Sequence, residues 1–387
     1  MLGLFLFAAS APTPLYAIYA ARWQFTPSTI TVIFAVYAVA LLATLLVAGS
    51  LSDAVGRRPV ILAALVVQSL SMLAFLAADG VGWLFLARIG QGVATGLVTA
   101  AVAAALIDHQ PPDRPGLGAL LNAVTSMIGL ATGSLIAGAL VQYAPDPLRL
   151  VYSVMLVGFV GLAVATLRVP ETVTRRRRVD LVPRLGVEPR ARAPFLVALP
   201  CVVASWALGG LYLSLGPSLI GRIDHSANHL LGGAIAFSLC AAGALTSLFV
   251  ARWSPHRAMV TGCALLVVGL TITVVAIAFE LGWLLFAGSV IAGAGFGSGF
   301  LGSFRSLAAV ASREHRSELI ATLYVAAYLA FALPAVVAGV LTTRFGVEPT
   351  SIGYAIVVAA LAAGSLTAAV LRRHNAPVSP LPGSERT

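Results

Sequence analysis

The chain has 387 residues, of which 59% are hydrophobic and only 10% are charged, and its mean hydropathy is +0.96. A soluble domain carries about 25% charged residues, so this composition excludes an ordinary soluble protein and predicts one embedded in a bilayer. The net charge is +10 with histidine neutral, and arginine is the only other basic residue type in the chain. Most of the arginines fall in short gaps between apolar segments, which indicates a role in orienting the chain in the membrane rather than in binding nucleic acid.

The apolar segments predict an all-α membrane protein with twelve transmembrane helices. A helix needs about 20 apolar residues to cross the hydrocarbon core of a bilayer. On this measure the spans are predicted at 2–20, 28–48, 59–78, 82–106, 116–141, 148–168, 194–219, 230–251, 258–279, 282–304, 317–341 and 351–371. The cysteines lie inside these spans without the spacing of a disulfide framework or a metal knuckle, so we expect packing and no metal site at Cys201, Cys240 and Cys263.

A short polar stretch separates the second predicted span from the third. It resembles the signature loop of the major facilitator superfamily through the pattern Gly49-x-Leu51-x-Asp53-x-x-Gly56-Arg57-Arg58. Glycines suit a tight bend or a close helix approach. The resemblance implies that Asp53 docks on the amino end of the eleventh helix, near Ser317–Ala321, and latches the outward-facing state. A helix amino end carries partial positive charge, which would favour this contact.

The fourth predicted span contains Arg88, the only basic residue well inside a span. A buried arginine costs several kcal/mol unless it is paired or hydrated, so we expect Arg88 to face the interior of the bundle. The alternative is that it snorkels toward the outer face. Arg88, Gln91 and Gly92 resemble the fourth-helix motif of the same superfamily. In proton-coupled members this arginine is implicated in proton transfer or in holding a central carboxylate.

The fifth predicted span carries a glycine motif formed by Gly129, Gly133 and Gly138. It resembles the fifth-helix motif of the superfamily's antiporters, although Ser134 stands where that pattern has proline. Ordinary close packing of helices also explains such glycines.

Several polar and aromatic residues on the spans are candidates for a substrate cavity. Aromatic residues also anchor helices at membrane edges or pack in cores, so these alternatives stay open. No carboxylate lies near the middle of a span to hold a proton or a cation in turn, and no enzymatic constellation or phosphate loop is present. We therefore expect no enzyme and no cofactor. The cavity candidates are Tyr16, Asn122, Trp206, Tyr212, Tyr324 and Tyr328.

The longest polar interval divides the chain into two halves. The predicted organisation is a six-helix half at 1–169, a cytoplasmic linker at 170–193, a second half at 194–373 and a disordered cytoplasmic tail at 374–387. An internal repeat supports this division, because Gly82–Arg88 resembles Gly282–Gly288. Two pseudo-symmetric six-helix halves are what the family resemblance implies.

The arginines predict the orientation of the spans. With the signature loop in the cytoplasm, nineteen arginines fall on the cytoplasmic side and four on the outer side. Both termini are then cytoplasmic. The absence of lysine suggests a bacterial source, so we expect a multi-pass protein of the bacterial inner membrane.

The family resemblance implies a secondary transporter that works by alternating access. It is similar to the twelve-helix drug–proton antiporters, so the expected activity is proton-driven efflux of small amphipathic compounds. The expected partners are a small-molecule substrate, protons and the lipid bilayer, with no nucleic acid, and a monomer is the simplest assembly. The alternatives are a sugar or metabolite permease of the same fold and, from another class, a non-transporting membrane sensor or scaffold.

Overall fold

The computed structural model describes residues 1–108, 110–111, 113, 117–168, 185–226, 228–312 and 315–374, apart from the side chains of 27, 49–50, 53, 104, 107–108, 119, 316–317 and 372–374. The predicted linker from 170 to 184 and the predicted tail from 375 lie outside the described residues. The described chain is helical throughout. Its helices are α1 (Leu2–Ser10), α2 (Tyr16–Trp23), α3 (Pro27–Val55), α4 (Arg57–Leu76), α5 (Val81–Asp108), α6 (Leu117–Tyr143), α7 (Pro147–Thr166), α8 (Pro189–Ser214), α9 (Gly216–Ile223), α10 (His229–Val250), α11 (Pro255–Ala278), α12 (Gly282–Val310), α13 (Arg316–Phe345) and α14 (Val347–His374).

Eleven described helices are long and apolar enough to cross a membrane. The short helices α1 and α2 together make one further crossing, and α9 extends the crossing made by α8. This count agrees with the twelve predicted spans. The first and seventh spans, predicted as single helices, are instead interrupted, at Ala11–Leu15 and at Leu215. Prolines at 12, 14 and 217 explain the interruptions, because a proline has no amide hydrogen to continue a helix.

The connection between α3 and α4 is shorter than predicted. Residues 49–55 were expected in a polar turn, but α3 continues through Gly49 and Asp53 to Val55, and α4 begins at Arg57. Gly56 alone makes the bend, with φ 115° and ψ 154°, a conformation that residues with a side chain rarely adopt. Of the two glycines expected to bend the chain, only Gly56 does so. The end of the bundle that carries this bend is called the signature end, and the opposite end, where α2 leads into α3 and α9 into α10, is called the far end.

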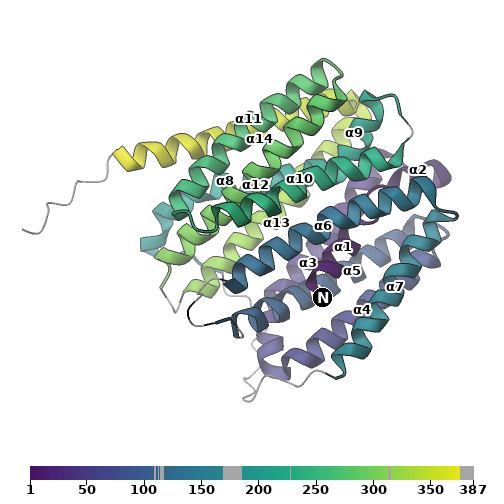
Figure 1. Cartoon of the computed structure of the whole chain (residues 1–387), viewed down its shortest axis with the longest axis horizontal. Coiled ribbons are helices and arrows are strands. Elements are labelled where there is room, and N and C mark those ends of the chain that lie inside the picture. The colour runs from purple at the N-terminus through teal and green to yellow at the C-terminus, as the bar shows by residue number, and fades with distance from the viewer. Residues whose placement is uncertain are drawn as a thin grey trace, which may run out of the picture.

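The helices form two groups, α1–α7 and α8–α14, each with its own apolar core. The first core is built within residues 2–163, and the second group has two core clusters, one of which also takes in three residues of α6. Figure 1 shows the first group in purple to blue and the second in teal to yellow, with α6 and α10 side by side where they meet. The other main contact between the groups joins α3 to α13. The groups therefore meet through these two helix pairs and through two small apolar clusters, one that joins α1 and α3 to Ala332 and one that joins Phe34 to Leu213, Ala236 and Ala335.

Glycines of α12 allow the closest packing in the second group. A Cβ atom added at Gly293 or Gly297 would strike the backbone of α10, and one added at Gly295 would lie 2.6 Å from the Leu266 nitrogen of α11. Gly299 in turn faces Gly262 of α11. These glycines let α12 approach two neighbours at once, as expected where small residues line a membrane helix interface.

Candidate functional site

The interruption of the first span leaves backbone carbonyls without their usual partners. In a continuous helix the Ala8 oxygen would accept from the amide of residue 12, which here is Pro12 and has none. The Ala9 oxygen would accept from Thr13, but the Thr13 amide bonds to Ser10 O at 3.0 Å. Buried carbonyls of this kind need other donors, since an unpaired polar group in an apolar interior is costly.

Two side chains of α5 supply the missing donors. Arg88 Nη1 donates to Ala9 O at 2.9 Å and to Gln91 Oε1 at 2.8 Å, and Gln91 Nε2 donates to Ala8 O at 3.0 Å. Arg88 is 1% exposed and Gln91 is fully buried. We call Arg88 and Gln91 the brace. Arg88 thus points into the bundle as expected and does not snorkel to the surface.

The Arg88 guanidinium also lies over aromatic rings that lead to the second group. Its Cζ atom is 4.2 Å from the ring centre of Tyr37 and 5.9 Å from that of Phe34, both on α3. Phe34 in turn packs against Phe331 of α13, with ring centres 4.8 Å apart. Cation–π contacts stabilise a buried cation, and here they place a fixed positive charge one aromatic layer from the interface.

An aromatic cluster collects three of the predicted cavity residues. The ring centre of Trp206 on α8 lies 4.7 Å from that of Tyr328 on α13. The ring centre of Tyr328 lies 6.3 Å from that of Tyr324, also on α13. Phe331 also contacts Trp206, at 6.0 Å between ring centres, so the cluster continues to Phe34 of the first group. The indole nitrogen of Trp206 is buried without a hydrogen-bond partner among the described residues. This cluster offers apolar area and one free donor at the interface.

The other predicted cavity residues lie apart from this cluster. Tyr212 is in the core of the second group, where its hydroxyl hydrogen-bonds to that of Thr273 at 2.7 Å. Asn122, on α6, has a buried side-chain oxygen that finds no hydrogen-bond partner in the part of the chain that the structure describes. Tyr16 begins α2 at the far end of the bundle. The structure therefore brings together only part of the predicted set.

The glycines of the predicted fifth-helix motif serve two contacts. A Cβ atom at Gly129 or Gly133 would strike the backbone of α1, whereas one at Gly138 would lie 3.0 Å from His229 O of α10. Gly92, predicted alongside the arginine, would place its Cβ 2.5 Å from Tyr37 O of α3. These glycines position helices, and α6 holds α1 on one side and the second group on the other.

The predicted latch is described only in part. Arg57 Nη1 donates to Ser52 Oγ at 2.7 Å, and Arg58 Nη2 donates to Leu167 O at the end of α7. The side chains of Asp53 and Ser317 lie outside the described residues. The docking of Asp53 on the start of α13 therefore stays a prediction.

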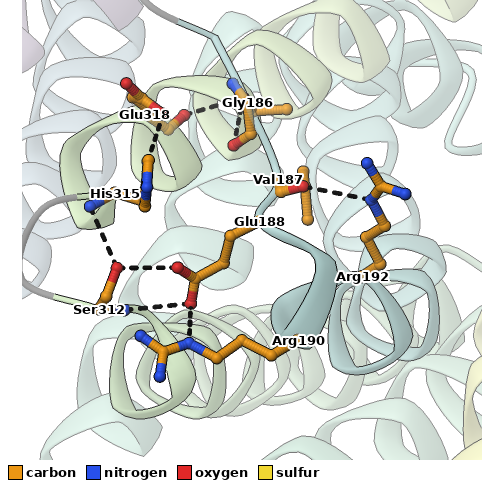
Figure 2. A network of polar contacts seen from close by, with 9 residues as sticks. Gly186, Val187, Glu188, Arg190, Arg192, Ser312, His315 and Glu318 are labelled. Atoms are coloured by element: carbon orange, nitrogen blue, oxygen red, sulfur yellow. Dashed lines mark hydrogen bonds and ion pairs between the residues drawn. The ribbon is translucent and has the colours of Figure 1, made fainter.

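A polar network at the signature end ties the start of α8 to the α12–α13 connection (Figure 2). Glu188 accepts from Arg190 and from the Ser312 hydroxyl at 2.8 Å. The Arg190 bond and then the Ser312 bonds lower the pKa of Glu188 to about 2. His315 Nδ1 meets Glu318 Oε2 at 3.0 Å. Since α8 begins at Pro189, the last residues of the predicted linker are helical and held in place.

Comparisons with known proteins now bear on this arrangement. A model of the Major Facilitator Superfamily matches residues 1–272 and 222–387, which together span the whole chain. The chain belongs to this superfamily. No curated protein matches the sequence. The superfamily's fold is that of secondary transporters, which agrees with the multi-pass helical architecture described above.

Solved structures of other superfamily transporters share the fold at low identity. A bacterial homologue of the human lysosomal transporter Spinster, inward-facing and unoccupied, matches with a TM-score of 0.72 at 14% identity, over 97% of both chains. The same homologue in its occupied form gives 0.73 at 14% identity and the same coverage. A POT family transporter in complex with 5-aminolevulinic acid gives 0.73 at 12% identity, over 96% of this chain and 95% of the other.

The sequence predicted the two residues of the brace but not the backbone carbonyls that they bond. Arg88 and Gln91 were predicted from the motif that this superfamily member carries, whereas the Ala8 and Ala9 carbonyls were not. The available signal was Pro12, four residues after Ala8, because its missing amide guarantees a free carbonyl. No sequence signal indicated the aromatic path through Phe34 and Phe331.

Proposed function

We propose that this chain is a secondary transporter in which the groups α1–α7 and α8–α14 rock against each other, and that it exports small amphipathic compounds with the proton gradient as energy source. The observation that carries the proposal is the pair of contacts, α3 with α13 and α6 with α10, between groups that have largely separate cores. Two bodies that meet along one interface can change their relative tilt without unpacking either core.

The contacts that would open are explicit at the far end. Gly339 of α13 faces Thr31 of α3, where a Cβ atom would have no room. Gly233 of α10 faces Gly138 of α6, with the added Cβ 3.3 Å from the Gly138 Cα atom. The His229 amide donates to Gln142 Oε1 at 2.9 Å. These contacts are made by small residues and a single hydrogen bond, which suits an interface that must separate and close again.

Amphipathic cargo is supported by the cluster of Trp206, Tyr324 and Tyr328 at the interface, since aromatic rings bind apolar surface and Trp206 adds a donor. Proton coupling rests on the family resemblance. No carboxylate stands in the middle of a span in the sequence. This observation favours a second candidate, a permease for a sugar or metabolite.

Sidedness completes the proposal. The arginine asymmetry supports a cytoplasmic signature end, cytoplasmic termini and an outer far end, and the membrane we propose is a bacterial inner membrane. A monomer contains both groups and therefore the whole rocking interface.

The proposal is tested in everted membrane vesicles energised to an acid interior. Dyes and antibiotics are added while a pH-sensitive fluorophore reports proton release, in wild type, Asp53→Asn and Arg88→Ala. Gly353→Ala is the matched control, because nothing lies within 4 Å of a Cβ atom at that position. Compound-dependent release by wild type and the control alone supports antiport. If no compound causes proton release but a radiolabelled metabolite is taken up, the permease is supported. If compounds bind to the protein in liposomes but are not translocated, a sensor or scaffold is supported.

A further inference from the structure

A cavity of about 190 Å³ opens at the far end, between the two helix groups. Its walls come from the α1–α2 interruption, the start of α3, the α8–α9 interruption and the start of α10. It is separate from the aromatic cluster around Trp206. The lining residues that carry the argument are Thr13, Tyr16, Ala17, Ser218, Asn228 and His229.

The two interrupted walls correspond to each other in the two groups. Each group begins with a proline-broken helix, α1–α2 in the first and α8–α9 in the second. The breaks, at Ala11–Leu15 and Leu215, stand about 200 residues apart, the offset that also relates Gly82 to Gly282. Interrupted helices in corresponding positions of the two halves point to binding sites in transporters of repeated architecture.

The lining contains hydrogen-bonding groups but no carboxylate and no guanidinium. Thr13 is 6% exposed, and its hydroxyl has no partner within the described part of the chain. Asn228 uses its side-chain oxygen to cap α10, accepting from Leu230 N at 2.9 Å, which leaves the amide hydrogens as donors. Pro14, Ile30 and Pro217 supply apolar wall.

Charge is disfavoured in this setting for a physical reason. An ion that enters must give up hydration, and the lining has no carboxylate for a cation and no guanidinium for an anion to repay that loss. An uncharged molecule with a few hydrogen-bonding groups loses least.

We propose that this far-end cavity is an outward-facing cargo subsite that selects uncharged amphipathic molecules over permanent cations and anions. The cavity is smaller than the ≈ 300–1,000 Å³ of ordinary drug-sized sites, so it holds a small molecule or one end of a larger one. The inference rests on the proposed transport function and names the charge class of its cargo.

The first test measures the cavity without any cargo. Ala17→Cys places a thiol in the lining, and Ala21→Cys, one turn further along α2 and also exposed, is the matched control outside it. The native cysteines are at most 1% exposed, so wild type gives the background. Intact cells are treated with hydroxyethyl, trimethylammonioethyl and sulfonatoethyl methanethiosulfonate, and modification rates are measured.

The neutral reagent is expected to modify both variants at rates within about threefold, whereas each charged reagent modifies Ala17→Cys at least tenfold more slowly than Ala21→Cys. Equal ratios for all three reagents would overturn the proposed charge selection. Failure of every reagent at Ala17→Cys, with Ala21→Cys labelled, would show that the cavity is closed to the outside and would overturn the subsite.

The second test fills the cavity. A Cβ atom at Gly221 would meet only Ser226 O, at 3.5 Å, so Gly221→Leu can extend into the cavity, and Gly353→Leu is the control in open space. Transport of uncharged Nile red is expected to fall at least fivefold in Gly221→Leu alone, with ethidium and fluorescein poor substrates of wild type. Equal transport of the three dyes and no effect of Gly221→Leu would overturn the inference. If wild type moves no compound while the labelling pattern holds, the transport function fails and the cavity's charge preference stands.

Discussion

The helices α5 and α12 begin with similar sequences, Gly82–Arg88 and Gly282–Gly288, yet differ at the seventh position. Arg88 in α5 braces the broken first helix, whereas a Cβ atom at Gly288 in α12 would lie 2.7 Å from Thr273 Oγ1 of α11. The two groups thus use corresponding helix positions differently: position 88 of α5 holds a buried charge, and position 288 of α12 allows close helix packing.

The two helix breaks explain this difference. The α8–α9 break keeps backbone bonds on both sides of Leu215, whose amide donates to Leu211 O and whose oxygen accepts from Leu219 N, both at 2.9 Å. The α1–α2 break spans five residues and leaves the Ala8 and Ala9 oxygens to side-chain donors. A group with the wider break needs a long polar side chain nearby, and the other group is free to carry glycine.

The largest effect is expected where glycine packing is broken in the second group. Gly262→Leu would drive a side chain into the backbone of α12 at Gly299. We expect more than about 3 kcal/mol of destabilisation, because backbone obstructs the new atoms on a face that cannot give way. Size-exclusion profiles in detergent should show loss of monodisperse protein. Gly353→Leu should elute as wild type, and normal elution of Gly262→Leu would contradict the packing described for α11 and α12.

Removing the buried charge of Arg88 in the first group should give the next largest loss of stability. Arg88→Leu leaves Ala9 O and Gln91 Oε1 without their donor and removes the contact with Tyr37. We expect about 2–5 kcal/mol of lost stability and transport reduced more than tenfold. Thermal unfolding in detergent measures the first effect. The exposed Arg149→Leu is the control, and equal melting temperatures for both variants would mean that the broken helix does not depend on the brace.

Gln91→Met sharpens the same comparison with a smaller change. It keeps the length of the side chain but loses the bond to Ala8 O and the acceptor for Arg88. We expect about 1–2 kcal/mol, the cost of a buried carbonyl left unpaired. Melting temperatures should fall between those of wild type and Arg88→Leu. A double variant no less stable than Arg88→Leu alone would confirm that the two residues act as one unit.

The smallest effect is expected at the signature end, in the polar network around Glu188. Glu188 has a lowered folded-state pKa of about 2 against an ordinary 4.5, so its carboxylate stabilises the fold above pH 4.5 and loses this contribution as the pH falls toward 2. The melting-temperature difference between wild type and Glu188→Gln should be constant from pH 7 to about 5 and shrink below about 4.5. Asp146→Asn, at an exposed carboxylate, is the control. A difference that persists at pH 2–3 would contradict the assigned bonds.

The helical crossings and the buried arginine could be predicted because each depends on one property. Apolar length determines whether a segment crosses a bilayer, and an unscreened guanidinium inside a span must turn inward. The signature stretch was misjudged because its polar residues suggest a turn, although only Gly56 leaves the helix.

The cavity residues could be predicted only in part, because their neighbours come from distant helices. Trp206 and Tyr212 stand six residues apart on α8, so their side chains point in directions about 120° apart around the helix axis. The sequence cannot say which direction meets α13 and which meets α11. The structure places Trp206 against Tyr328 and Tyr212 against Thr273.

The brace also has a consequence for biosynthesis. The carbonyls of Ala8 and Ala9 enter the membrane with the first helix, but Arg88 and Gln91 are translated about 80 residues later, on the order of 4–16 s at ordinary elongation rates. During that interval the nascent first helix holds two unsatisfied acceptors, and α5 then arrives with a charge that lipid rejects. The unpaired carbonyls of the first helix and the charge of α5 are therefore compensated only when the two segments meet. Assembly of the first group is therefore expected to wait for α5, with the insertion machinery sheltering the first helix until then.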